Sequence, residues 1–280
     1  MICLKWFFLP LLFFTTGLAA NAQSLPAPEP TPAVAKSPSL EHEFFKNILR
    51  DQKAIWTAPL HVERSDAKWM IPSAVGFMAL ATTDRITGDE MSEAERQVGL
   101  SKAISHAGSV YGLGAVATTF YLIGRKNHDY RARETGLLSA EALIDSLIVE
   151  SALKGITQRA RPSAGRERSE FFDGGNSFPS GHSTQAWAVA TVIANEYKDR
   201  PAVQIAAYGI ASAVSVARFT GHKHYLSDVV AGSALGYGIG RYVYGAHHRD
   251  PAVSQSRWPR ITPEFDRAAG QYGCALTWNF

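Results

Sequence analysis

Two histidines in the second half of the chain, His182 and His224, stand where apolar helical stretches begin. Asp228 follows His224 by four residues, so the two side chains share one face if a helix begins there. A carboxylate on one ring nitrogen fixes the tautomer and leaves the other nitrogen able to attack an electrophile. The pair therefore predicts a nucleophilic histidine held by a carboxylate, with a surface ion pair near a helix start as the alternative.

The segment Ser177-Phe178-Pro179-Ser180-Gly181-His182 leads into the helical stretch that contains His182. Proline and glycine favour a tight turn at this place, and Gly174 and Gly175 lie just upstream. Ser180 can cap the helix, and the amides at a helix N-terminus form an anion site. This segment predicts a site where His182 reaches a bound anion, with an ordinary capped helix start as the alternative.

Three cations accompany these groups, namely Lys154, Arg161 and Arg218. Lys154 and Arg161 lie near the predicted end of a helix that Pro162 helps to terminate. They could equally be a solvated helix end, where cations favour the negative end of the helix dipole. Cations and amides can neutralise the charge of a phosphoryl group, while one histidine attacks and another protonates the leaving alcohol. Together the three clusters predict phosphoryl transfer without a metal ion.

The order and the spacing of these residues resemble the three motifs of the type 2 phosphatidic acid phosphatase and haloperoxidase superfamily. Six residues separate Lys154 from Arg161-Pro162, the second motif is Pro179-Ser180-Gly181-His182, and Arg218, His224 and Asp228 form the third. The resemblance covers about residues 130 to 245. One departure is Ala217, which stands before the third-motif arginine where the family often has serine.

The resemblance implies a role for each matching residue. His224 would be the nucleophile and form a phosphohistidine, and Asp228 would orient it. His182 would donate a proton to the leaving group and later accept one from water. The phosphate would be held by Lys154, Arg161, Arg218, Ser180 and the amide of Gly181. Because His224 must be neutral and His182 protonated, we expect a bell-shaped pH profile. His222 is out of register and is interpreted as a bystander or rim residue.

Several functional interpretations follow from these motifs. The first is a phosphatase acting on a soluble phosphomonoester or on a lipid phosphate such as phosphatidic acid. The second is a vanadate-dependent haloperoxidase, because vanadate copies the geometry of phosphate. The third is a non-catalytic envelope protein that binds phosphate. No cofactor or metal site is expected, since neither His222-Lys223-His224 nor His247-His248 has zinc-ligand spacing, and His247 and His248 are interpreted as part of a solvated helix end.

The elements that must position these residues are apolar helical stretches, and strand signals are nearly absent before the C-terminus. The pattern predicts an all-α bundle of about six core helices. The stretches are 69–83, 103–124, 136–153, 182–197, 202–218 and 226–243. Most are short or carry charges, so they are interpreted as buried helices of a globular protein, with a compact polytopic membrane enzyme as the alternative.

Residues 39–56 form a further helical candidate, in which six residues recur at helical spacing with charges between them: Phe45, Ile48, Leu49, Gln52, Ile55 and Trp56. We expect this helix to pack on the core through these residues. The alternative is a helix that lies on a membrane surface.

The two ends of the chain differ from the middle. Residues 1–22 have a lysine, a short apolar run and an A-x-A site, which predicts a signal peptide and export to the periplasm or cell envelope. Residues 23–38 are a Pro-rich tether, 39–248 the predicted helical phosphatase domain and 249–280 a C-terminal tail. Alternation from Tyr272 to Phe280 predicts a short strand in that tail.

Composition narrows the partners. The 28 basic and 25 acidic residues give a formal charge of +3, too even for a nucleic-acid-binding face. The two cysteines, Cys3 and Cys274, leave one thiol after signal removal and no internal disulfide. The expected partner is a phosphomonoester or lipid phosphate, together with a membrane surface if the substrate is a lipid. The sequence leaves the oligomeric state open.

Overall fold

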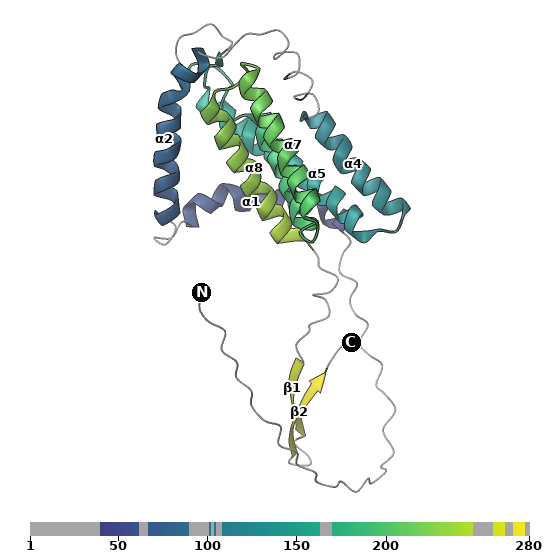
Figure 1. The fold of residues 1–280 in the computed structure, drawn as a ribbon. Helices are drawn as coiled ribbons and strands as arrows, with labels where there is room; N and C mark the ends of the chain where they lie inside the picture. The colour runs from purple at the N-terminus through teal and green to yellow at the C-terminus, as the bar shows by residue number, and fades with distance from the viewer. Residues whose placement is uncertain are drawn as a thin grey trace, which may run out of the picture. The chain divides into compact units, whose positions relative to one another are not determined.

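The computed structural model describes residues 40–61, 67–89, 101, 104, 108–162, 170–248, 260–266 and 271–277. Figure 1 shows the helices and one two-stranded sheet. The longer elements are α1 (Leu40–Thr57), η1 (Ala58–His61), α2 (Ala67–Asp89), α4 (Val110–Lys126), α5 (Tyr130–Thr157), α6 (Gly181–Glu196), α7 (Pro201–Thr220) and α8 (Leu226–His247). The all-α bundle is therefore confirmed, and each of the six predicted stretches overlaps one helix from α2 to α8. The signal peptide predicted at 1–22 and the tether predicted at 23–38 lie outside the described residues.

Local sequence explains where these helices begin and end. Ser109 accepts a hydrogen bond from the amide of Gly112, so α4 begins at Val110 and not at residue 103 as predicted. Asp129 caps α5 in the same way through the amide of Ala132. At the other end of α5, Gln158 has a left-handed backbone with φ of 46°, which ends the helix and turns the chain into the site loop.

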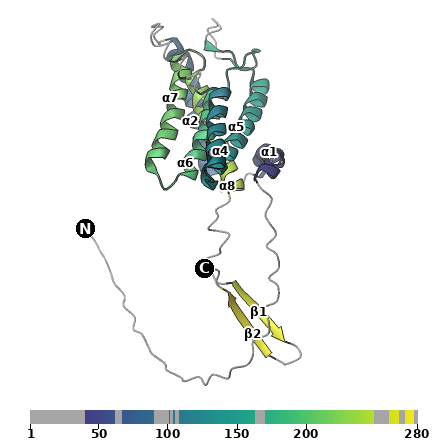
Figure 2. The ribbon, with the colours of Figure 1, turned by 90° about the vertical axis from the view of Figure 1, so that its right-hand side faces the viewer.

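Helix α6 is the centre of the bundle and packs against α4, α5, α7 and α8. Figure 2 shows α4, α5, α6 and α7 running side by side. The buried apolar side chains of α6 are alanine and valine, and they belong to both apolar clusters of the core. Small side chains allow the helix axes to approach closely, so the groups at the helix ends are held by packed backbone.

The approach of α6 and α8 depends on a row of glycines, Gly232, Gly236 and Gly240. A methyl group added at Gly236 would lie 2.0 Å from the carbonyl oxygen of Thr184. At Gly232 it would lie 2.7 Å from the carbonyl oxygen of Ser180. These contacts are with backbone, which cannot rotate away, so α8 tolerates no side chain on this face.

Helix α1 is oriented differently from the expectation. Ile48 is buried, as predicted, but Phe45, Leu49 and Trp56 point outward and are 76%, 73% and 42% exposed. The buried side of α1 is polar instead, with Asn47 donating to Glu141 of α5. The prediction that these apolar residues form one core-facing row was therefore wrong for three of them. Helical spacing shows which residues share a face, but the spacing does not show whether that face meets the core.

The polar side of α1 meets a buried acidic cluster at the end of α8 opposite His224. His247 lies 2.8 Å from both carboxylate oxygens of Asp51, and Gln52 donates to Asp145. His248 lies 3.5 Å from Glu134 and 3.2 Å from Glu196. The interpretation of His247 and His248 as a solvated helix end was therefore wrong, because both histidines face carboxylates of other helices. By distance alone, His247 with Asp51 and Glu141 would suit a cation, and so would His248 with Glu134 and Glu196.

Asp145 should make the stability of this bundle pH-dependent. Burial and the neighbouring Asp51 raise the pKa of Asp145 to about 7, despite the hydrogen bond from Gln52. Asp51 raises the pKa of His247 as well, against the effect of burial. The folded state thus holds protons that the unfolded chain releases, so the contribution of this cluster is present at low pH and is lost as pH rises to about 7.

We expect Asp145→Asn to flatten this dependence by about 2 kcal/mol between pH 5 and pH 8. The measurement is chemical unfolding of wild type and variant at both pH values. Subtracting the pH dependence of the variant from that of the wild type cancels the contributions of carboxylates elsewhere, which have the opposite sign. Parallel pH dependences of the two proteins would contradict a titrating Asp145.

Much of the outer surface of the helices is apolar, which departs from the expectation of buried helices. Large exposed side chains include Met70, Ile71, Val75 and Met78 of α2. Among the described residues, α7 is the one helix whose length and composition would suffice to cross a membrane, and 28% of its apolar window is buried. Contiguous apolar surface of this kind marks an interaction site.

The predicted C-terminal strand is confirmed as β2 (Gln271–Thr277), which pairs antiparallel with β1 (Arg260–Asp266). Its partner was not predicted, because Pro263 and the charged residues of 260–266 interrupt the alternation that marks a strand.

Candidate active site

The predicted site residues come from the ends of α5, α6, α7 and α8 and from the two loops beside them. Lys154 lies in the last turn of α5, His182 in the first turn of α6, and Arg218 in the last turn of α7. His224 precedes α8, and Asp228 lies in its first turn. Besides burial, the charges of four groups lower the pKa of His182, namely Arg218, His224, Lys154 and Arg161. The residues of the three motifs therefore lie close together.

The His224 ring is held by the loop that carries the second motif. Its Nδ1 lies 2.7 Å from the carbonyl oxygen of Ser177, and the side chain is almost fully buried. A carbonyl can only accept, so Nδ1 carries the hydrogen and Nε2 carries the lone pair. Burial lowers the pKa of His224 despite the nearby Asp228 carboxylate, which keeps the ring neutral and nucleophilic.

Asp228 is not the direct partner of His224 that its spacing suggested. Its Oδ2 lies 3.8 Å from His224 Nδ1, which is within ion-pair range and beyond hydrogen-bond range. The helix begins at Leu226, so His224 and Asp228 are not stacked on consecutive turns. Asp228 Oδ2 accepts from the hydroxyl of Ser177 at 2.5 Å and from the amide of Tyr225 at 3.0 Å. Asp228 therefore holds the residue that follows His224 and the residue whose carbonyl oxygen lies at the His224 ring.

Arg159 completes this support and was not given a role by the motif comparison. Its guanidinium, 1% exposed, donates to Asp228 Oδ1 at 2.5 Å and to Asp84 Oδ2 at 2.7 Å. Asp84 also accepts from the amide and the hydroxyl of Ser227. Arg159 thus connects α2 to the first turn of α8 through two carboxylates. Asp84 could have been noticed in the sequence, because it ends a stretch, 69–83, without any charge.

Aromatic rings cover the Arg159 guanidinium and exclude water from these ion pairs. Its central carbon lies 4.7 Å from the Phe171 ring centroid and 4.5 Å from that of Tyr225. Burial raises the pKa of Asp228, but His224, Arg159 and Ser177 outweigh it and hold that pKa below its ordinary value. The Asp228 carboxylate is therefore ionised at neutral pH, beside the predicted nucleophile His224.

The three cations predicted to bind phosphate differ in how far their donors are already used by other residues. Arg218 is 9% exposed, and its Nε has no hydrogen-bond partner among the described residues. Burial lowers the pKa of Arg218 to about 10, so it stays charged at neutral pH. Arg161 donates from Nε to Asn176. Lys154 lies 2.6 Å from Glu150, so a bound phosphate must share this cation with a buried carboxylate.

The start of α6 presents backbone amides to the site. Ser180 is the N-cap residue, but its hydroxyl accepts no amide hydrogen bond, which differs from the capping role predicted for it. The hydroxyl accepts from Ser183 instead, and the Ser180 amide donates to the carbonyl oxygen of Asp228. The first-turn amides that follow, including that of Gly181, have no acceptor within the helix. An added methyl group at Gly181 would lie 2.9 Å from Lys154 Nζ and from both carboxylate oxygens of Glu150, so these two side chains would have to shift.

The free site holds His182 in its neutral form. Burial and the charge of Arg218, with His224, Lys154 and Arg161, lower the pKa of His182 to about 4. A phosphate dianion among these cations opposes their effect and favours the protonated ring. The proton that a general acid needs would therefore be taken up together with the substrate.

We expect His182→Ala to slow hydrolysis by roughly 10²–10⁴-fold for an alkyl phosphate. An aryl phosphate should be affected much less, because its leaving group departs without a proton. Phosphate release from the two substrates by the same variant measures this difference. Equal losses on both substrates would show that His182 does not protonate the leaving group.

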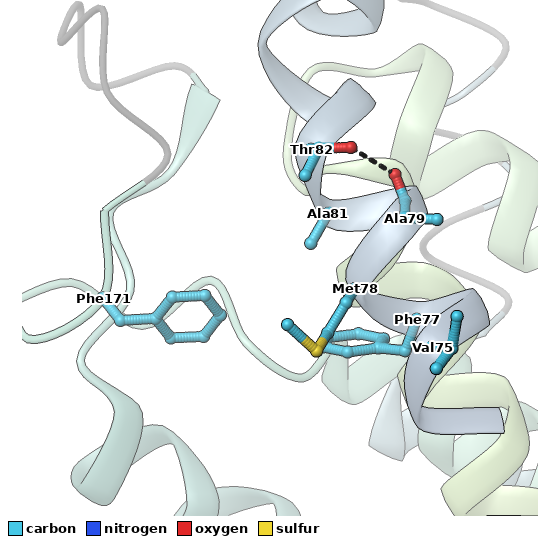
Figure 3. A pocket seen from close by; sticks show the side chains of 7 residues that line it. All are labelled: Val75, Phe77, Met78, Ala79, Ala81, Thr82 and Phe171. Carbon is cyan, nitrogen blue, oxygen red and sulfur yellow. Dashed lines mark hydrogen bonds between the residues drawn. The ribbon is translucent and has the colours of Figure 1, made fainter. Parts of the chain in front are cut away.

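An apolar cleft of about 850 Å³ lies beside this site, between α2 and the loop that contains Phe171. Figure 3 shows Val75, Phe77 and Met78 on one side and Phe171 on the other. The ring of Phe178, directly before the second motif, lies 5.6 Å from the rings of both Phe77 and Phe171. The cleft therefore adjoins the phosphate site through Phe178.

Comparison with known proteins agrees with this geometry. Residues 135–251 match the model of the PAP2 superfamily, and this confirms the resemblance that the three motifs carry. This matching segment contains every predicted catalytic and phosphate-binding residue.

Similar proteins include a lipid A 1-phosphatase of Porphyromonas gingivalis, 33% identical over 103 residues, which are 36% of this chain and 23% of the relative. A PA-phosphatase related-family protein of Dictyostelium discoideum is 27% identical over 168 residues, which are 53% of this chain and 61% of the relative. The chain thus matches less than two thirds of each of these relatives.

Two solved structures are similar as well. The transmembrane PAP2-type phosphatidylglycerolphosphate phosphatase from Bacillus subtilis is 23% identical, with a TM-score of 0.44, covering 73% of this chain and 94% of that protein. LpxE of Aquifex aeolicus is 20% identical, with a TM-score of 0.46, covering 59% of this chain and 93% of that protein.

Proposed function

We propose that this chain is an exported phosphatase that hydrolyses the phosphomonoester of a lipid through a phosphohistidine on His224. The observation that carries the proposal is the buried, neutral His224 ring, with Nδ1 bonded to Ser177 and Nε2 left to attack. The unpartnered Nε of Arg218 and the amides of α6 supply what a phosphate at that position requires.

In the first step, Nε2 of His224 attacks phosphorus in line with the leaving oxygen. The P–N bond forms, the P–O bond breaks, and His182 gives its proton to the departing alkoxide. The charge on the three equatorial oxygens is balanced by Arg161, Arg218, Lys154 and the first amides of α6. The imidazolium that forms at His224 is stabilised by the nearby Asp228 carboxylate, which stays ionised.

In the second step, neutral His182 takes a proton from water, and the resulting hydroxide attacks phosphorus. The P–N bond breaks, inorganic phosphate leaves, and His224 returns to its neutral state. Each step transfers one proton through His182, so the cycle closes without a metal ion or a cofactor.

The apolar cleft supports a lipid as the substrate. Its lining is almost wholly apolar, and it adjoins the phosphate site through Phe178, so it suits the acyl part of a phosphorylated lipid. The name of the relative from Porphyromonas gingivalis, a lipid A 1-phosphatase, agrees with this substrate class.

The test is phosphate release by the purified chain in the presence of EDTA, comparing short-chain phosphatidic acid with an aryl phosphate. We expect release from both, with a higher kcat/KM for the lipid. Met78→Asp, which places a charge in the cleft, should remove the preference and leave aryl phosphate hydrolysis unchanged. Binding of phosphate without hydrolysis of any substrate would favour the binding-protein interpretation. Halide oxidation with vanadate and peroxide would favour the haloperoxidase interpretation.

A further inference from the structure

The helix α1 precedes the segment shared with the PAP2 superfamily, and its outward face is apolar. Phe45 and Leu49 are 76% and 73% exposed, and Leu60 in the following turn η1 is 81% exposed. At 100° per residue, Phe45, Leu49 and Trp56 fall within a sector of about 40°. These three residues form one exposed apolar row along the outward side of α1.

The inward side of α1 is polar, which is the reverse of a helix that packs on a core. Asn47 and Asp51 are 3% and 0% exposed. They bond to Glu141 and His247 at 3.1 and 2.8 Å, and Gln52 bonds to Asp145 at 2.8 Å. These directional bonds to α5 and α8 fix the rotation of α1, so its apolar row cannot turn inward.

Basic residues border this row on one side. Lys46, Arg50 and Lys53 are exposed, and Glu43 is the carboxylate that pairs with the first two. Trp56 belongs to the apolar row, and its indole N–H donates to Gln52. An apolar row that contains a tryptophan and has a cationic border is the pattern of a helix at a lipid–water interface.

We propose that α1 lies on an anionic lipid surface, with Phe45, Leu49 and Leu60 in the acyl region and Lys46 and Lys53 among the headgroups. The excess of cations beside the row favours this partner over an apolar protein surface. The proposal stands independently of the phosphatase activity, because it rests on contacts at the end of α8 opposite His224.

The test uses a fluorescent probe on single cysteines in the full chain, with Cys3 and Cys274 replaced by serine. The polarity-sensitive NBD group is attached at Leu49→Cys and, as the matched control one residue away, at Arg50→Cys. The proteins are mixed with vesicles of phosphatidylcholine and phosphatidylglycerol, with and without nitroxide-labelled acyl chains.

We expect the probe at position 49 to shift to the blue and to be quenched by the nitroxide lipid several-fold more strongly than the probe at position 50. Equal access of iodide to position 49 with and without vesicles would overturn the proposal. A blue shift that grows with protein concentration without vesicles would overturn it too, in favour of a second copy. Aryl phosphate hydrolysis by each labelled protein reports on the catalytic site separately, so failure of one proposal is not mistaken for failure of the other.

Discussion

Replacing His224 with alanine is expected to lower phosphate release by roughly 10⁴-fold or more, on lipid and aryl phosphates alike. The alanine variant lacks the atom that forms the bond to phosphorus, so a better leaving group does not restore the rate of phosphate release. The measurement is release of inorganic phosphate under single-turnover and multiple-turnover conditions.

The control for this variant is its fold and its phosphate affinity. Because Arg218, Arg161 and Lys154 remain, His224→Ala should still bind phosphate or vanadate, measured calorimetrically. Brief reaction of the wild type with ³²P-labelled substrate should leave acid-labile, alkali-stable label on the protein, and the variant should carry none. Normal turnover by His224→Ala would exclude the proposed nucleophile.

Replacing Arg159 with methionine should give the largest loss of stability, about 3–5 kcal/mol. The substitution keeps the apolar stem of the side chain and removes the cation between Asp84 and Asp228. Both carboxylates then stay buried without their common partner, which costs more than the lost bonds alone. The measurement is urea unfolding, and phosphate release should fall as well, because Asp228 also holds the backbone around His224.

Two further variants separate the ion pairs from the volume of the side chain. Arg159→Lys keeps the charge but cannot bond to both carboxylates in a planar fork, so its loss should be intermediate. Adding Asp84→Asn to Arg159→Met should cost less than the sum of the two single changes, since one unpaired carboxylate is gone. An Arg159→Met protein within about 0.5 kcal/mol of wild type would contradict the network.

The sequence was sufficient to locate most of the helices and to indicate that the residues of the three motifs lie near one another. Apolar periodicity located α2 and α4 to α8, and the spacing of Lys154, His182 and His224 indicated residues whose helix ends meet. These features follow from local pattern, because a helix of given apolar spacing must bury one side. The role of Asp228 was only partly predicted, since four-residue spacing implies a shared face only where the helix has already begun.

Long-range partners could not be predicted from the sequence. Arg159 and Asp84 are 75 residues apart, and their meeting depends on how α2 packs beside α8. The same limit explains α1, where the row of Phe45 and Leu49 was recognised but assigned to the wrong environment. His247 and His248 were taken as solvated for a similar reason, because their carboxylate partners come from α1, α5 and α6.

The predicted reacting groups and the lining of the apolar cleft come from different parts of the chain. The predicted reacting groups belong to α5–α8, whereas α2, which lines the apolar cleft, precedes the segment that matches the superfamily model. A substitution in the cleft-lining part of α2 therefore changes the cleft and leaves the predicted reacting groups in place. Asp84 is the exception on α2, because its loss removes one of the two carboxylates that Arg159 binds.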